Sequence, residues 1–68
     1  MQRKRRIKYS ELEKKLKLFG CQLSENGKRH PIWISPITGL KFAMSYHKSE
    51  EVAEGTLRDI LKKAGVKL

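Results

Sequence analysis

Apolar residues near the start of the chain recur at the spacing of one helical face. These residues are Leu12, Leu16 and Phe19. Ser10 and Glu13 have the spacing of a capping box, in which two side chains satisfy backbone N–H groups at the start of a helix. Gly20 then supplies the residue type that commonly ends a helix. The pattern predicts a helix over about residues 11–19, with its three apolar side chains in the core.

A second stripe at helical spacing lies near the end of the chain. Its members are Leu57, Ile60, Leu61 and Ala64. Thr56 and Asp59 repeat the capping spacing, and Gly65 follows the stripe. We therefore expect a helix between Thr56 and Gly65 whose leucines and isoleucine are buried.

Between these helices, apolar and polar residues alternate with the period of half-buried strands. Leu23 belongs to the first alternating segment, and Asn26-Gly27 is typical of a two-residue hairpin turn. β-Branched and aromatic residues predict a second strand over about residues 29–35, and residues 36–39 predict another turn. A third strand contains the alternating residues Leu40, Phe42 and Met44.

The order of these elements predicts an α+β fold of the type α-β-β-β-α. Each helix has one apolar face, so we expect both helices on one side of a three-stranded antiparallel sheet. The other face of the sheet is then open to solvent, which is the layout of double-stranded RNA-binding folds. We expect a single domain over residues 9–68, preceded by a flexible basic arm over residues 1–8.

Positive charge is concentrated in two parts of the chain. The 68 residues include 16 Lys and Arg against 7 Asp and Glu, which gives a formal net charge of +9. Residues 1–8 hold one group of cations, and residues 26–48 hold another without any carboxylate. The cations of this second group are Lys28, Arg29, Lys41 and Lys48. Such a block is typical of a surface that binds nucleic acid, although it can also simply solvate a sheet face.

Composition argues against several other classes of protein. The single cysteine, Cys21, has no disulfide partner in the chain, and no Cys or His spacing fits a zinc site. The longest uncharged segment, residues 31–40, is too short to cross a bilayer. The basic block lacks the carboxylates that hold Mg²⁺ in metal-dependent nucleases. We expect a cytoplasmic protein with no membrane segment, metal or small-molecule cofactor.

Histidine is the remaining candidate for catalysis. An imidazole can take a proton from one oxygen and give one to another near neutral pH, and RNA supplies its own nucleophile, the 2′-hydroxyl. His30 follows Lys28 and Arg29 just after the predicted turn, which puts a proton carrier beside two phosphate-binding groups. A core position is the alternative, because an unbroken strand would place His30 on the helix side with the isoleucines of its strand. Pro31 permits a strand start or bulge that redirects it.

Three more side chains have open assignments. His47 lies beside Lys48 before the second helix, where it can bind phosphate, assist proton transfer or do neither. Trp33 alternates with the isoleucines around it and so can lie on the open sheet face near Lys41, where a nucleobase would stack on it. The alternative is that Trp33 packs under the basic arm or against a partner protein. Tyr46 is equally undecided.

Two segments carry a more specific pattern. Residues 26–33 read NGKRHPIW and have the arrangement Gly-x-x-His-x-x-aromatic, and residues 54–65 read EGTLRDILKKAG. With these segments in this order, the chain from about residue 8 to residue 68 resembles the HicA toxins of bacterial and archaeal toxin–antitoxin systems, also called YcfA-like proteins. Lys28 and Arg29 stand where the family often has Gly, Ser or Asn.

The resemblance implies a double-stranded-RNA-binding-like fold that acts as an mRNA interferase, an endoribonuclease that inhibits translation and growth. It implies that His30 is the catalytic acid/base, that Gly27 is the turn residue, and that His47 matches a histidine often present before the second helix. It also implies mRNA as the substrate and a HicB-type antitoxin that covers the active site.

We therefore predict a metal-independent ribonuclease in which His30 moves protons during attack by the 2′-hydroxyl. The residues predicted to contact RNA are Lys28, Arg29, Trp33, Lys41, His47 and Lys48. One alternative is a non-catalytic RNA- or DNA-binding module that uses the same surface. The other is an interaction protein whose basic face docks an acidic partner.

Overall fold

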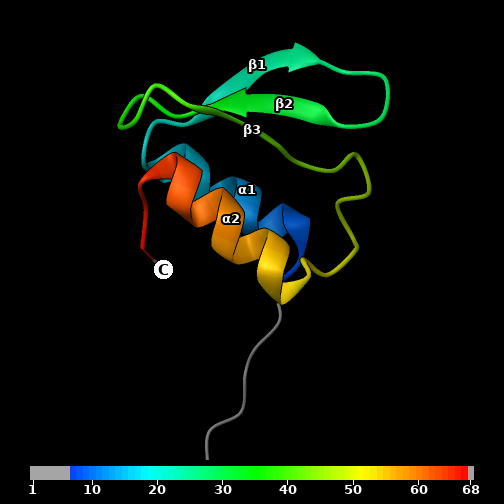
Figure 1. Cartoon of the computed structure of the whole chain (residues 1–68). Helices are drawn as coiled ribbons and strands as arrows, with labels where there is room; N and C mark the ends of the chain where they lie inside the picture. Colours follow the sequence, from blue (N-terminus) through cyan, green and yellow to red (C-terminus); the bar gives the residue numbers. More distant parts are fainter. Residues whose placement is uncertain (1–6, 68) are drawn as a thin grey trace, which may run out of the picture.

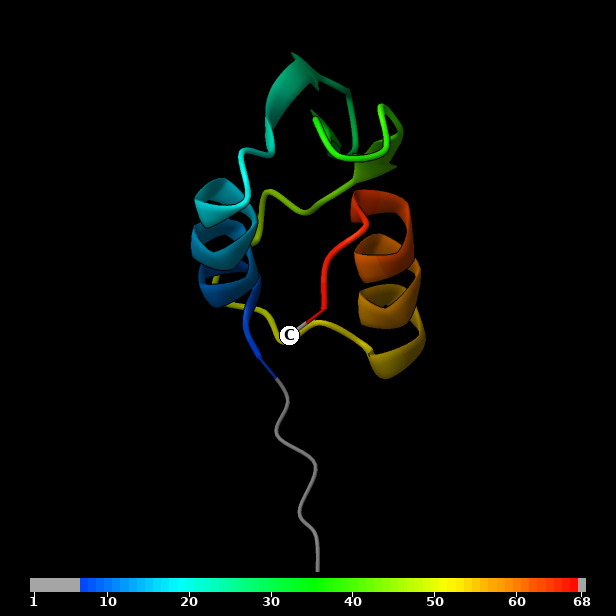
Figure 2. The ribbon, with the colours of Figure 1, turned by 90° about the vertical axis from the view of Figure 1, so that its left-hand side faces the viewer.

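The computed structural model describes residues 7–67 and has the predicted α-β-β-β-α order (Figure 1). Its elements are α1 (Tyr9–Leu18), β1 (Gln22–Asn26), β2 (Pro31–Ile34), β3 (Lys41–Ala43) and α2 (Glu54–Ala64). The two helices lie side by side on one face of the sheet (Figure 2), so the predicted α+β architecture is confirmed. Neither helix of the described residues is long and apolar enough to cross a membrane.

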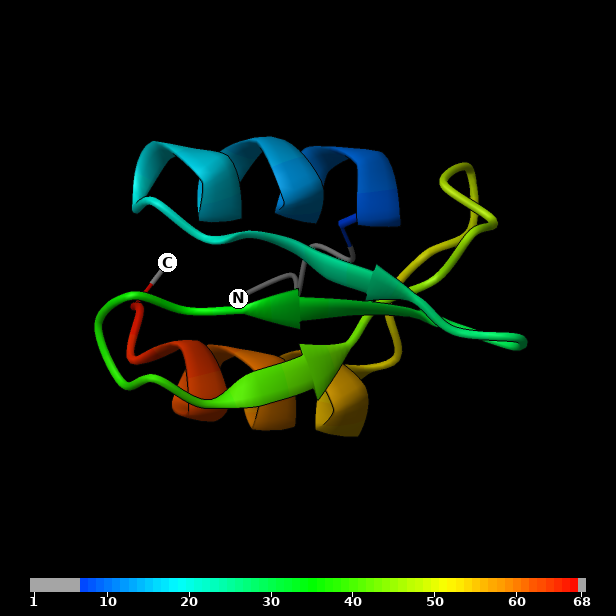
Figure 3. The same cartoon turned by 90° about the horizontal axis from the view of Figure 1, so that it is seen from above.

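The sheet is antiparallel and has the strand order β1-β2-β3. Seen from above, β1 lies on the side of α1, and β3 lies over α2 (Figure 3). The central strand β2 therefore spans the space between the two helices. The β1–β2 loop precedes β2, and the β2–β3 turn follows it at the opposite end of the sheet.

The β1–β2 loop is longer than the predicted two-residue turn. Asn26 pairs with Pro31, so residues 27–30 form a four-residue loop and β2 begins at Pro31. The tight turn favoured by Asn-Gly needs positive φ at both central residues. Neither Asn26 nor Gly27 has a positive φ. The basic residues and His30 consequently lie on the loop rather than in the strand.

The two faces of β2 are opposite to those expected. Trp33 pairs with Phe42 of β3, and both side chains are buried on the helix side. Ile32 and Ile34 are half-buried and belong to the other face. The expectation that the isoleucines face the helices is wrong, because burying a Trp–Phe pair removes more apolar surface from water than burying Ile32 and its partner Ala43.

The core lies between the sheet and the two helices. Its buried apolar side chains are Leu12, Leu16, Cys21, Trp33, Phe42, Met44, Val52, Ile60, Ala64 and Val66. The predicted burial of the two α1 leucines and of Ile60 is confirmed. Leu57 and Leu61 are half-buried and pack against this cluster.

Phe19 is a wrong prediction, since 45% of its surface is exposed. α1 ends at Leu18, and the chain then turns at Gly20, which has a φ of +90°. The N–H of Cys21 donates to the carbonyl oxygen of Leu16 at 3.0 Å. Cys21, rather than Phe19, therefore enters the core below the end of the helix.

α1 begins earlier than its capping pattern predicts. The N–H groups of Tyr9 and Ser10 donate to the carbonyl oxygens of Glu50 and Lys48, each at 3.0 Å. A segment distant in sequence thus satisfies the first amides of the helix, and no side chain caps it. Ser10 lies inside the first turn, so the predicted capping box is wrong.

α2 likewise begins before the predicted capping pair. The helix starts at Glu54 with Ala53 at the N-cap position and no side-chain cap, so Thr56 lies within its first turn. The pairing of Thr56 with Asp59 as a cap is therefore wrong. The end of the helix agrees with the prediction, because Gly65 takes the left-handed conformation with a φ of +71°.

The β2–β3 turn is fastened to the end of α2. The fully buried hydroxyl of Ser35 donates to the carbonyl oxygen of Ala64 at 2.7 Å, and the hydroxyl of Thr38 donates to the carbonyl oxygen of Lys63. These hydroxyls satisfy carbonyls of the last helical turn. A Cβ at Gly65 would lie 2.7 Å from the methyl carbon of Thr38, so the contact also requires glycine.

The start of the described chain belongs to the folded body. The N–H of Val52 donates to the carbonyl oxygen of Ile7 at 2.8 Å, and Lys8 forms an antiparallel bridge with Glu51. Of the expected basic arm, residues 1–6 lie outside the described residues. Ile7 and Lys8, which the same prediction included, are paired with the segment that leads into α2.

Candidate active site

The β1–β2 loop folds closely on itself. A Cβ at Gly27 would lie within 3.0 Å of the carbonyl oxygen of His30, a distance that real side chains essentially never adopt. The hydroxyl of Tyr46 donates to the carbonyl oxygen of Gly27 at 2.7 Å. The loop presents Lys28, Arg29 and His30 as exposed side chains. Gly27 and Tyr46 thus fix the part of the backbone that carries His30.

Three residues predicted for the site line one cavity of about 410 Å³: Arg29, His30 and His47. The cavity lies between the β1–β2 loop, the end of β3, and the segment before α2. Its other lining residues are Tyr9, Ala43, Met44, Ser45, Glu50 and Thr56. The fold thus brings together two imidazoles and a guanidinium from segments that are distant in sequence.

His47 is held at this cavity by a local turn. The backbone N–H of His47 donates to the hydroxyl oxygen of Ser45 at 3.0 Å, and its backbone carbonyl oxygen accepts from the N–H of Glu50 at 3.1 Å. Turns of this kind are common, with the serine hydroxyl accepting a hydrogen bond from the backbone N–H two residues later in the chain. Ser45 was therefore detectable as a positioning residue from its spacing to His47, although the sequence analysis did not include it.

The polar groups of the cavity suit an anionic ligand. Arg29 contributes a fixed positive charge, and Glu50 contributes a carboxylate. Thr56 lies in the first turn of α2, where helix amides favour negative charge. Within residues 7–67, no group of three His, Cys, Asp or Glu side chains is arranged to hold a metal ion. The cavity therefore combines two imidazoles and one guanidinium, which suit a phosphodiester, with the single carboxylate of Glu50.

Four of the six predicted RNA contacts do not line this cavity, and Lys41 and Lys28 are two of them. Lys41 pairs in register with Ile34, at the far end of β2, and its ammonium lies 3.8 Å from the carboxylate of Glu25. Lys28 is exposed on the same loop as His30, next to the cavity but not among its lining residues. Lys28 therefore remains near the candidate site, whereas Lys41 lies away from it.

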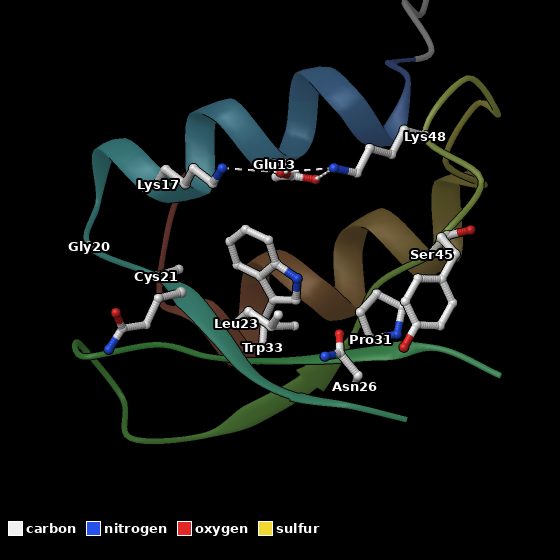
Figure 4. A pocket seen from close by; sticks show the side chains of 12 residues that line it. Glu13, Lys17, Gly20, Cys21, Leu23, Asn26, Pro31, Trp33, Ser45 and Lys48 are labelled. Carbon is white, nitrogen blue, oxygen red and sulfur yellow. Dashed lines mark hydrogen bonds and ion pairs between the residues drawn. The ribbon is translucent and has the colours of Figure 1, made fainter. Parts of the chain in front are cut away.

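A second hollow, of about 580 Å³, lies between α1 and β1 and contains two more predicted contacts (Figure 4). We call it the α1–β1 groove. Trp33 forms part of its wall and is only 5% exposed, so the open-face position allowed for this ring is wrong. Lys48 reaches the groove from the segment before α2, and its ammonium lies 3.3 Å from Glu13. Ser45 lines both this groove and the cavity at His30.

Comparison with known proteins gives a family match over most of the chain. The sequence model of the family described as HicA toxin of bacterial toxin-antitoxin matches residues 9–66. The searches of curated proteins and of solved structures gave no significant match. The matched range runs from α1 to just past α2 and includes the loop with Gly27 and His30. A toxin of this kind has a cognate antitoxin as its partner. Because the match covers most of its length, the chain belongs to the HicA toxin family.

Proposed function

We propose that this toxin is an endoribonuclease that cleaves messenger RNA in the cytoplasm by histidine acid–base catalysis, and that it thereby inhibits translation and growth. The observation that carries the proposal is the shared cavity of His30, His47 and Arg29. RNA cleavage through the 2′-hydroxyl needs a base, an acid and positive charge at the phosphate. These three side chains supply all of them.

The proposed reaction is an internal transfer at phosphorus. One imidazole takes the proton of the 2′-hydroxyl while that oxygen attacks the adjacent phosphorus. The bond from phosphorus to the 5′-oxygen breaks, and the leaving oxygen receives a proton from the second imidazole. The products are a 2′,3′-cyclic phosphate and a 5′-hydroxyl. His30 is our essential proton carrier, and His47 is our candidate for its partner.

Positive charge beside the imidazoles supports the same reaction. Arg29 lines the cavity and can stabilise the charge that develops on the phosphoryl oxygens. Lys28 is its neighbour on an exposed loop, where it can hold an adjacent phosphate. Because RNA provides the nucleophile and these side chains provide the charge, no step requires a divalent cation.

We further propose that the antitoxin is of the HicB type and covers this cavity. The loop with His30 is exposed, so a partner can reach it. A net charge of +9 favours a partner with an acidic surface. Covering the loop would separate the imidazoles from RNA and so neutralise the toxin.

The test replaces His30 with Ala in the full chain and follows cleavage of a labelled single-stranded RNA in the presence of EDTA. Loss of a general acid or base typically lowers the rate by about 10²–10⁴-fold, so we expect cleavage to fall by at least about 100-fold while affinity for RNA largely survives. His47→Ala should also slow cleavage. If wild type and His30→Ala bind RNA equally but neither cleaves it, the protein is a non-catalytic RNA-binding module.

A further inference from the structure

We propose that the α1–β1 groove is a nucleotide-binding subsite that accepts one unpaired base of the RNA beside the phosphate cleaved at His30. The inference rests on the proposed ribonuclease function and adds to it the form of the substrate. It is carried by the position of the groove beside the cavity at His30, by the chemistry of its walls and by its charge.

The groove borders the candidate active site. Ser45 lines both hollows, so they are neighbours in the structure. Asn26 and Pro31 also line the groove, and they flank the loop of residues 27–30 that carries His30. In the proposed complex, an RNA strand with a phosphate at His30 has its next nucleotide in the neighbouring groove.

The walls of the groove match the parts of a nucleotide. Trp33 and Leu23 give it an apolar side, and Leu23 is 47% exposed and therefore accessible to a base. The amides of Gln22 and Asn26 can donate to and accept from the edge of a base. A volume of about 580 Å³ lies within the usual range of small-ligand pockets, about 300–1,000 Å³.

Two lysines place positive charge along the groove. The ammonium of Lys17 lies 3.2 Å from Glu13 and 5.9 Å from the centre of the Trp33 ring. Lys48 approaches the same carboxylate from the opposite direction at 3.3 Å (Figure 4). Glu13 is only 16% exposed, so it is a fixed anchor that holds both ammoniums beside the groove. The trio keeps one net positive charge, which suits a phosphate next to the bound base.

This charge favours RNA over a protein as the occupant. The cores of protein–protein interfaces are depleted of charged residues, whereas three charged side chains line this groove. The hollow shape of the groove also distinguishes between forms of RNA, because bases are accessible to a pocket only when they are splayed out of a helix. We therefore infer that the protein takes single-stranded RNA, although its architecture resembles a double-stranded RNA-binding fold.

The main test uses full-length His30→Ala protein, so that RNA is bound but not cut. Leu23→Glu in this background puts a negative charge into the groove, and Leu40→Glu, at a leucine that is 51% exposed and does not line the groove, is the matched control. We expect Leu23→Glu to weaken binding of a labelled single-stranded RNA about tenfold, and Leu40→Glu to change it by less than about twofold; a tenfold change corresponds to 1.4 kcal/mol. The same RNA as a duplex should bind more weakly than the single strand.

A second pair of variants probes the positive charge of the groove and leaves strand β1, which carries Leu23, unchanged. The slope of the logarithm of RNA affinity against the logarithm of salt concentration should become less steep by about 0.7 in Lys17→Gln. This is the value for one phosphate contact on a single strand. Lys15→Gln, on the same helix but not among the residues lining the groove, should leave the slope unchanged.

The outcomes separate this inference from the proposed function. Equal RNA binding by Leu23→Glu and Leu40→Glu would overturn the subsite, as would a duplex that binds as tightly as the single strand. If Leu23→Glu binds RNA normally but, in the otherwise wild-type chain, escapes neutralisation by the cognate antitoxin, the groove is a protein-docking site. A wild-type protein that fails to cleave RNA would remove the ribonuclease function, whereas the binding measurements would still decide whether the groove holds a nucleotide.

Discussion

The two ends of the sheet differ in how they are held. At the β2–β3 turn, Ser35 and Thr38 donate hydrogen bonds to the last carbonyls of α2, one of them from a fully buried hydroxyl. At the β1–β2 loop, the side chains are exposed, and the hydroxyl of Tyr46 holds the backbone at Gly27. One end is thus fastened to α2, partly through a buried hydroxyl, and exposed side chains available for chemistry lie at the other.

Each end also requires a glycine, for different reasons. Gly27 has an ordinary backbone conformation but no space for a side chain, because the carbonyl oxygen of His30 occupies that position. Gly65 has both a left-handed conformation and a close contact with Thr38. A methyl group added at either position is therefore a local probe of the corresponding end.

The largest effect is expected from Gly27→Ala, on catalysis. The new methyl group must displace the backbone at His30, and a misplacement of about 1 Å can slow an enzyme by about 100-fold. We expect single-turnover cleavage to fall by about that factor, while the affinity for single-stranded RNA changes by less than about threefold.

The matched control for this substitution is Gly55→Ala. Nothing lies within 4 Å of a Cβ at Gly55, and it lies within α2, where alanine is more favourable than glycine. This variant should cleave RNA as the wild type does and be slightly more stable. Equal activity of Gly27→Ala and wild type would show that the close fit of the loop does not position His30.

The opposite end is tested by Gly65→Ala, whose effect is expected on stability. A left-handed conformation costs an alanine about 1–2 kcal/mol, and the overlap with Thr38 adds to this cost, so we expect a loss of about 2–3 kcal/mol in the free energy of unfolding. The measurement is a urea unfolding curve. Cleavage per folded molecule should remain unchanged.

Gly39→Ala separates the two contributions at Gly65. Gly39 also has a positive φ, of +73°, but a Cβ there would meet nothing within 4 Å. It should therefore show the conformational cost alone, about 1–2 kcal/mol. If both variants lose equal stability, the overlap of the new methyl group with Thr38 has no measurable cost, and the close contact of α2 with the β2–β3 turn does not require glycine at position 65.

The order of elements was predictable because it depends on local periodicity. The leucine stripe of α1 and the terminal Gly65 each appear within a few residues of sequence, and both agree with the structure. The helix starts did not follow their local patterns. The first amides of α1 are satisfied by Lys48 and Glu50, from a segment that local sequence does not connect with Ser10.

The two faces of β2 show a second limit of prediction from local sequence. Alternation assigns Trp33 and Ile32 to opposite faces but does not say which face is buried. That choice depends on the register with β3, which pairs Trp33 with Phe42. Both residues were visible in the sequence, yet their pairing depends on the length of the β2–β3 turn, so the burial of Trp33 was not decided by local pattern.

The candidate site was predictable only where its residues are neighbours in the sequence. His30 and Arg29 are adjacent on the loop, so their proximity follows from the sequence. The approach of His47 to the same cavity follows from the path of the chain after β3. The separation of Lys41 from this cavity likewise follows from the register, which places it opposite Ile34 at the far end of β2.

The smallest expected effect is that of Tyr46→Phe, which removes the hydrogen bond to the carbonyl oxygen of Gly27 but keeps the ring. An exposed hydrogen bond of this kind contributes about 0.5–1 kcal/mol, so we expect a loss of that size in the free energy of unfolding and a decrease of about threefold in the single-turnover cleavage rate. The decisive measurement is the double variant with Gly27→Ala. Because the hydroxyl acts through the loop that Gly27→Ala already displaces, the second substitution should add almost nothing to the loss of cleavage. Independent, multiplicative effects would instead place the action of Tyr46 outside the loop, for example in the α1–β1 groove that its ring also lines.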